Sequence, residues 1–85
     1  MIEFRPDQPK YEQVAAEIRR RIAAEIYRPG MPIPGEPRLA EEFGVARRTA
    51  RKALELLIAA GDVYTVRSMG TFVSQPKEAQ EQSGE

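Results

Sequence analysis

Residues 35–61 read GEPRLAEEFGVARRTARKALELLIAAG and predict two helices joined by a tight turn. The first helix begins near Glu36, because a carboxylate suits the positive N-terminal end of a helix and Pro37 fits its first turn. Gly44 breaks this helix, since glycine readily adopts the left-handed conformation that ends one. The second helix covers about residues 47–60. This order of elements predicts a helix-turn-helix.

The second of these helices has an apolar side and a basic side. The apolar side holds Ala50, Ala53, Leu54, Leu57 and Ile58. Four bases form two pairs with a spacing of four residues in each pair, so that all four share one exposed face of the helix. They are Arg47, Arg48, Arg51 and Lys52. A local cluster of bases is the electrostatic footprint of a phosphate-binding surface.

A longer helix is predicted before this stretch, over about residues 9–27. Apolar residues follow helical spacing there, at Tyr11, Val14, Ile18, Ile22 and Ile26. Pro29 and Gly30 end the helix. The segment 31–34 that follows is rich in proline and forms a short edge strand at most.

After Gly61 the pattern changes from helical to alternating. The β-branched and aromatic runs 63–66 and 71–73 predict two strands, and residues 67–70 between them predict a hairpin loop. Three helices followed by such a hairpin form a winged helix-turn-helix, a mainly α-helical fold in which the small β-hairpin is the wing.

The length of 85 residues predicts one domain, over residues 9–73. Residues 1–8 form an N-terminal arm in this interpretation. Residues 74–85 are polar, and we expect this tail to be disordered.

The composition removes several classes of function. The chain has neither His nor Cys, the residues most used as general base, metal ligand and thiol nucleophile, so we expect no enzyme, no metal site and no cofactor. The 13 bases balance the 13 acids, so the basic character of residues 47–60 is local. The sequence shows no signal segment and no run of about 18 apolar residues, which predicts a cytoplasmic protein without a membrane partner.

Several short motifs at fixed spacings resemble the GntR-type bacterial transcription regulators. They are Ile33-Pro34-Gly35-Glu36, Leu39-Ala40, Gly44-Val45-Ala46-Arg47, Thr49, Arg51, Ala53-Leu54, Gly61 and Gly70-Thr71-Phe72-Val73. The resemblance covers about residues 9–73. It implies an N-terminal winged helix-turn-helix that binds double-stranded DNA, usually followed by a larger domain that binds an effector and forms dimers. No small-molecule effector site is visible in this chain.

The resemblance also implies which residues contact DNA. Arg47 and Thr49 would read bases or the adjacent backbone, Arg51 would hold a phosphate, and Gly70 with its neighbours would form the wing tip. The full set that we expect at the DNA is Arg38, Arg47, Arg48, Thr49, Arg51, Lys52, Arg67, Ser68, Met69, Gly70 and Thr71.

The chain departs from the family pattern at positions that matter for DNA contact. Pro37 stands where the family often has an arginine, so that contact is absent or moved to Arg38. Ala46 replaces a usual Ser or Thr, and Arg48 adds a charge where a small polar residue is common. In the wing, Ser68 lies in a loop where the family has two glycines. We therefore expect a distinct operator.

These observations predict a sequence-specific DNA-binding transcription regulator, which we interpret as a repressor. Residues 47–60 would read the major groove, and residues 63–73 the minor groove or the backbone. Two alternatives are a protein-interaction module whose basic face meets an acidic partner, and an excised DNA-binding domain of a longer, effector-responsive regulator. The resemblance implies a palindromic operator bound by a homodimer. Either the domain is a weak monomer that pairs only on DNA, or Met1, Ile2, Phe4 and the exposed parts of the first helix supply an interface.

Overall fold

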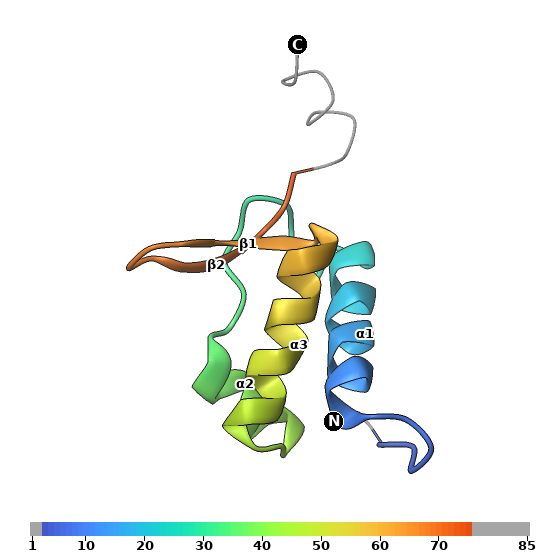
Figure 1. The fold of residues 1–85 in the computed structure, drawn as a ribbon. Helices are drawn as coiled ribbons and strands as arrows, with labels where there is room; N and C mark the ends of the chain where they lie inside the picture. The colour runs from blue at the N-terminus through green and yellow to red at the C-terminus, as the bar shows by residue number, and fades with distance from the viewer. Residues whose placement is uncertain (1–2, 76–85) are drawn as a thin grey trace.

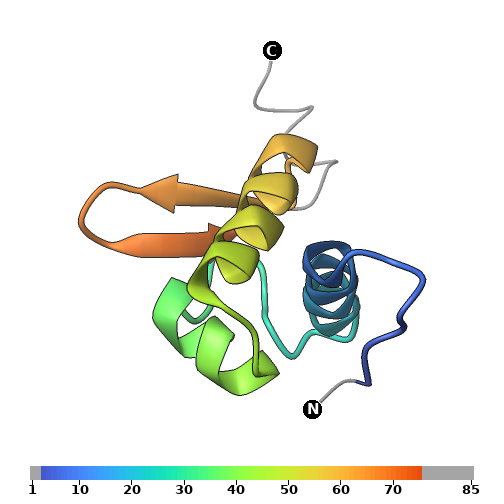
Figure 2. The same cartoon turned by 60° about the horizontal axis from the view of Figure 1, so that its bottom comes forward.

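The computed structural model describes residues 3–75 and arranges them as a winged helix-turn-helix (Figure 1). Its helices and strands are α1 (Lys10–Ala23), α2 (Glu36–Phe43), α3 (Arg47–Ala60), β1 (Val63–Val66) and β2 (Gly70–Val73). α1 packs along α3, and the antiparallel hairpin of β1 and β2 extends from the C-terminal end of α3, away from α1 (Figure 1, Figure 2). The predicted fold class is therefore confirmed.

The turn between α2 and α3 has the chemistry that the sequence predicts. Gly44 adopts a left-handed conformation with a φ of 68°, which glycine reaches without the steric cost that a Cβ brings. The backbone N–H of Val45 donates to the carbonyl of Ala40 over 3.0 Å. Ala46 then precedes α3 in an extended conformation and makes no side-chain cap. The turn thus fixes where α3 starts relative to α2.

α1 is shorter than the sequence pattern predicts. It ends at Ala23, because Glu25 adopts a left-handed φ of 63° and turns the chain. The backbone N–H groups of Ile26 and Tyr27 both donate to the carbonyl of Arg21, at 2.8 and 3.2 Å. Ile26 consequently leaves the apolar side of the helix and is 59% exposed. The predicted extension of this helix to residue 27 is wrong.

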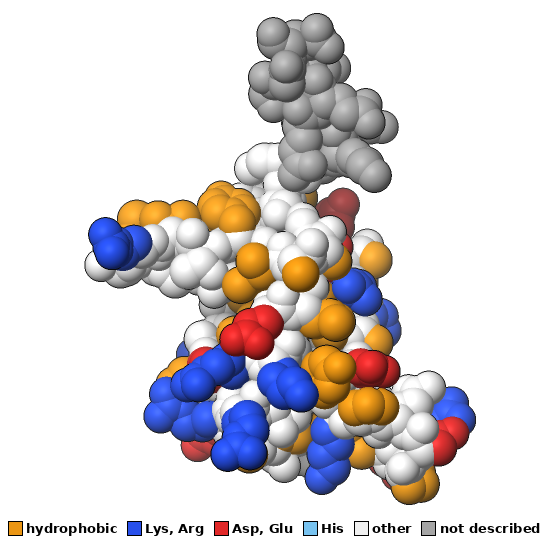
Figure 3. Space-filling view, in the orientation of Figure 1, with side chains coloured by type: hydrophobic (Ala, Val, Ile, Leu, Met, Phe, Trp, Pro, Cys, Tyr) orange, Lys and Arg blue, Asp and Glu red, His pale blue; other side chains and the backbone are white. Residues whose placement is uncertain are grey.

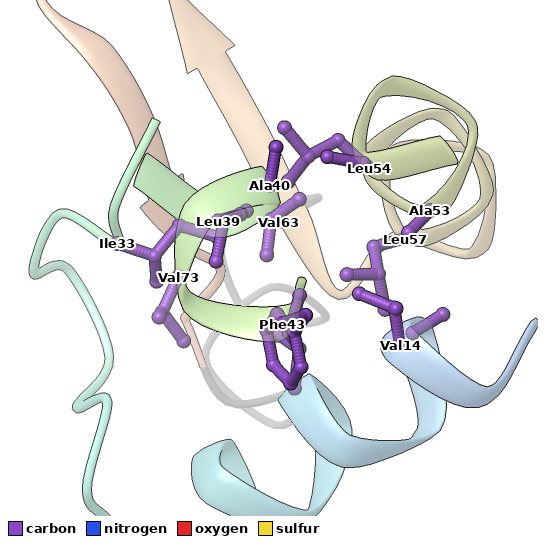
Figure 4. Packing of buried hydrophobic residues seen from close by; sticks show 13 residues of the cluster. Val14, Ile33, Leu39, Ala40, Phe43, Ala53, Leu54, Leu57, Val63 and Val73 are labelled. Atoms are coloured by element: carbon purple, nitrogen blue, oxygen red, sulfur yellow. The ribbon is translucent and has the colours of Figure 1, made fainter. Parts of the chain in front are cut away.

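The core lies between the three helices and the base of the hairpin (Figure 4). Its largest fully buried side chains are Phe43, Ile18, Leu39, Leu57, Val14, Val63 and Val73. Within residues 3–75, no polar or charged side chain is buried with them. The helical pattern places Ile58 on the apolar side of α3, but this residue is 42% exposed, and Leu56 packs against the core.

A third segment of backbone pairs with the hairpin. Pro32 forms an isolated antiparallel bridge with Phe72, and the N–H of Ile33 donates to the carbonyl of Thr71 over 2.9 Å. The segment 31–34 therefore contributes a single bridge in place of a full edge strand, and this bridge ties the wing to the loop before α2.

Two arginines of α1 join separate parts of the domain. Arg19 donates to the carboxylate of Asp62 over 2.7 Å and so connects α1 to the turn before β1. Arg21 donates to Glu42 of α2 over 2.6 Å, and its guanidinium lies 5.0 Å from the centre of the Phe43 ring. These arginines therefore stabilise the packing of α1.

The ion pairs that Glu17 forms with two arginines of α1 make the stability of the domain depend on pH. Arg20 donates two hydrogen bonds to the Glu17 carboxylate, at 3.0 and 2.8 Å, and Arg21 donates one over 3.0 Å. Arg20 is the main cause that lowers the pKa of Glu17 from 4.5 to about 2, with help from Arg21 and against the effect of partial burial. The folded protein therefore holds this carboxylate ionised at pH values where the unfolded chain protonates it.

We expect Glu17→Gln to flatten the acid response of the domain. In wild type the contribution of Glu17 is complete above pH 4.5 and is lost as the pH falls towards 2, because the pKa is lowered in the folded state. The thermal midpoint of wild type should therefore fall more steeply over this range than that of Glu17→Gln. Equal slopes in the two proteins would contradict the assignment.

Both ends of the chain reach beyond the described residues. Met1, Ile2 and residues 76–85, which include most of the tail expected to be disordered, lie outside them. Phe4 of the N-terminal arm is half-buried against the core, which reduces the surface that it offers as a dimer contact. Within residues 3–75, no helix is long and apolar enough to cross a membrane.

Candidate nucleic-acid interface

The basic side chains of the helix-turn-helix gather over α2 and the N-terminal half of α3 (Figure 3). The four α3 bases Arg47, Arg48, Arg51 and Lys52 are all exposed, as is Arg38 at the start of α2. Thr49 lies among them and is half-buried. The basic face that the spacing predicts is therefore present and accessible.

Arg47 and Arg51 lean towards α2, where both meet Glu36. Arg51 Nε donates to Glu36 Oε2 over 2.9 Å, and Arg51 Nη2 donates to Glu36 Oε1 over 3.2 Å. Arg47 Nη2 lies 3.5 Å from Glu36 Oε1. The hydrogen bonds from Arg51 are the main cause that lowers the pKa of Glu36, and the same contact raises the pKa of Arg51. Glu36 is therefore ionised and shared between two arginines.

Lys52 leans the other way, towards α1. Its ammonium lies 4.6 Å from the centre of the Tyr11 ring, within the range of a cation–π contact. Around the axis of α3, Arg48 lies between Arg51 and Lys52. It forms no ion pair with any residue in 3–75. The four bases thus share one broad face, with Arg51 on the α2 side and Lys52 on the α1 side.

The hairpin loop places Arg67, Ser68 and Met69 at the exposed tip of the wing. Met69 is 70% exposed, and its backbone N–H donates to the carbonyl of Val66 over 2.9 Å. Ser68 adopts a left-handed φ of 68°, and Gly70 has a φ of 117°. The loop therefore keeps a left-handed residue at position 68 although the side chain there is not glycine.

We expect Ser68→Gly to stabilise the domain slightly. A left-handed conformation costs an L-residue about 1–2 kcal/mol, and the greater freedom of glycine in the unfolded chain offsets roughly 0.4–1 kcal/mol of that gain. The thermal midpoint should therefore rise, whereas the control Ser74→Gly, at a residue whose φ is not positive, should lower it. A lower midpoint for Ser68→Gly would contradict this account of the loop.

The basic patch and the wing tip lie on the same side of the molecule, at different heights along α3 (Figure 3). Thr71 pairs with Thr65 in the hairpin and is half-buried, so it lies behind the exposed tip. The structure thus brings the predicted α3 and wing residues to one side as two separate groups.

Glu36 is the member of this surface that sequence reasoning missed. In the sequence, Glu36 is accounted for as a favourable charge at the start of α2, and no helical spacing relates this residue to Arg51. The only sequence signal is the predicted helix-turn-helix, because its tight turn brings Glu36, at the start of α2, to Arg47 and Arg51 in the first turns of α3.

Comparison with known proteins identifies the family. The family model described as bacterial regulatory proteins, gntR family, matches residues 10–73. The chain belongs to the GntR family. Its resemblance to GntR regulators, drawn from the motifs alone, is therefore confirmed.

Named members of the GntR family that resemble this chain are transcriptional regulators. The HTH-type transcriptional repressor NagR of Bacillus subtilis is 40% identical over 76 residues, which is 89% of this chain and 31% of that protein. The HTH-type transcriptional regulator GmuR of Bacillus subtilis is 44% identical over 66 residues, 78% of this chain and 28% of that protein. The chain thus spans less than a third of the length of each of these relatives.

Solved structures of GntR-type domains with DNA have the same fold. The AraR(DBD) structure in complex with operator ORX1 has a TM-score of 0.79 and 39% identity, and the match covers 86% of this chain and 93% of that one. The AraR NTD in complex with mutant ORR3 has a TM-score of 0.77 and 41% identity, covering 82% of this chain and all of the other.

Proposed function

We propose that this GntR domain binds double-stranded DNA in a sequence-specific way and is the DNA-binding part of a transcriptional repressor. The observation that carries the proposal is the exposed basic face of α3, which lies on the same side as a wing with Arg67 at its tip. The AraR domains that share its fold were solved in complex with operators, and NagR is a repressor by name, which supports the proposal. Such a role requires access to the chromosome and hence a cytoplasmic location.

In this proposal α3 enters the major groove with its N-terminal half. Arg47 has a side chain that is 65% exposed and donates to base edges, for which a planar guanidinium is suited because it can bond two acceptors on guanine. Thr49 contacts bases or the adjacent backbone, and Arg51 holds a phosphate. Arg38, Arg48 and Lys52 add phosphate contacts on either side of the groove.

The wing makes a second contact, with the minor groove or the backbone. Arg67 supplies charge at the tip, while Ser68 and Gly70 bring the backbone close and Met69 offers an apolar surface. Thr71 supports the tip from within the hairpin. Because α3 and the wing contact DNA at two separate places, their combined contacts fix the orientation of the domain on the duplex.

We also propose that two copies of the domain occupy a palindromic operator. Helix-turn-helix proteins that bind as pairs read half-sites spaced by about one helical turn of DNA, since the two-fold axis of the protein matches that of the operator. Sedimentation of the complex with a duplex that holds one or two half-sites would give the stoichiometry directly.

Selection of bound sequences from random duplex DNA tests the proposal as a whole. The expected result is an enriched motif with inverted symmetry, whose affinity falls with salt by a log–log slope of about −0.9 for each phosphate contacted. Equal recovery of all sequences would contradict sequence-specific binding. Failure to bind duplex DNA, together with capture of an acidic protein, would favour a protein-interaction module.

A further inference from the structure

Glu36 connects the start of α2 to the arginines of α3 that we place at the DNA. Both of its carboxylate oxygens accept hydrogen bonds from Arg51, and Arg47 lies within ion-pair distance. The Glu36 side chain is 20% exposed, whereas that of Arg51 is 60% exposed. The carboxylate is therefore the inner member of the pair, and the guanidinium lies over it towards solvent.

The geometry of this pair leaves a defined part of Arg51 free for DNA. A guanidinium carries five N–H donors in one plane, and Glu36 takes the edge formed by Nε and Nη2. Within residues 3–75, Nη1 has no acceptor, so the outer edge of Nη1 and Nη2 keeps donors that point away from the carboxylate. A flexible side chain is thus held in one orientation with its donating edge outward.

The same carboxylate limits the charge that α3 presents to any phosphate. Glu36 neutralises part of the positive charge of Arg47 and Arg51, and a phosphate that approaches these arginines is repelled by it. Non-specific binding depends on phosphate neutralisation alone, whereas operator binding also needs correctly oriented donors. The Glu36 carboxylate therefore weakens non-specific binding, because it repels phosphates, and strengthens operator binding, because it orients the arginine donors.

We propose that Glu36 is a positioning residue for Arg51 and, through the same carboxylate, for the base-reading Arg47, and that it raises affinity for the operator and lowers affinity for random DNA. This inference rests on the DNA-binding function proposed above. A purely structural ion pair at an exposed site contributes little, and its loss would change stability without changing the discrimination between DNA sequences. The ratio of the two affinities therefore separates positioning from simple stabilisation.

The test compares Glu36→Ala and Glu36→Gln with wild type on two fluorescent duplexes. One duplex carries the sequence selected from random DNA, and the other carries the same bases in scrambled order. Glu41→Ala is the matched control, because it removes one exposed carboxylate from the same helix and Glu41 forms no ion pair with any residue in 3–75. Thermal unfolding of each variant shows whether the domain is still folded at the assay temperature.

We expect Glu36→Ala to lower the ratio of operator affinity to scrambled-duplex affinity by about tenfold, because Arg47 loses the carboxylate that orients it towards a base edge. Affinity for the scrambled duplex should rise, and its salt slope should steepen by up to about 0.9 for each phosphate gained. Glu36→Gln, which keeps the shape and one acceptor oxygen, should fall between Glu36→Ala and wild type.

Two outcomes overturn the inference. If wild type discriminates between the duplexes but folded Glu36→Gln and Glu36→Ala give the same ratio as Glu41→Ala, Glu36 does not position Arg47 and Arg51, and this inference alone fails. A wild type that binds the selected and scrambled duplexes equally would overturn the proposed function and this inference with it.

Discussion

Replacing Arg47 with alanine is expected to lower affinity for the operator by about tenfold to a hundredfold, while affinity for scrambled duplex falls less. Arg47 starts α3 and its side chain is 65% exposed, so it is placed to meet a base edge at the N-terminal end of the helix. A bidentate contact between arginine and guanine discriminates against a wrong base by about 1–3 kcal/mol. Fluorescence anisotropy on both duplexes over a range of salt concentrations measures the two effects.

Arg51→Ala is expected to behave differently from Arg47→Ala. A lost phosphate contact weakens binding to all sequences by a similar factor and lowers the salt slope by about one. Arg28→Ala is the control, because Arg28 is an exposed arginine outside α3 and forms no ion pair with any residue in 3–75. If Arg28→Ala reduced operator affinity as much as Arg47→Ala, net charge alone would explain binding and the assignment to α3 would be wrong.

Phe43→Ala is expected to lower the free energy of unfolding by about 3–5 kcal/mol, the usual cost of removing a buried phenyl ring from a core. Phe43 is only 2% exposed, reaches from α2 to α1 (Figure 4), and lies under the Arg21 guanidinium. Its loss leaves a cavity where α1, α2 and α3 meet. Since a small domain has a total stability of about 5–15 kcal/mol, much of it depends on this ring.

Urea denaturation followed by circular dichroism measures the effect of Phe43→Ala. Ile58→Ala serves as the control, because Ile58 is 42% exposed and its truncation should cost less than about 1 kcal/mol. DNA binding by Phe43→Ala should fail at temperatures where the variant is unfolded and should recover on cooling. A loss of stability no greater than that of Ile58→Ala would mean that α2 is not held by this contact.

Local sequence signals were sufficient to predict most of the fold. Gly44 and Gly61 both have positive φ where the pattern predicts that helices end, and the alternation after Gly61 becomes the hairpin. Each of these signals acts within a few residues of where it stands in the chain, which is why it can be read without the structure. The basic face of α3 follows from helical spacing in the same way.

Contacts between distant parts of the chain could not be predicted. Spacing along α3 groups four bases together, but it does not show that Arg51 binds Glu36 or that Lys52 lies over Tyr11. Ile26 fits the helical period, yet the left-handed Glu25 before it ends the helical path. No glycine marks this position, so the end of α1 carried no recognisable signal.

The core and the proposed DNA contacts share α3 but have no residue in common. The buried cluster is entirely apolar, and the residues placed at the DNA are all exposed or half-buried. Exposed substitutions of this kind usually change stability by less than about 0.5 kcal/mol. We therefore expect that exposed α3 and wing-tip residues of another GntR domain, grafted onto this one, would change which DNA it binds without repacking of the interior. Such a graft must also include the residue at position 36, because we propose that its carboxylate orients the arginines of α3.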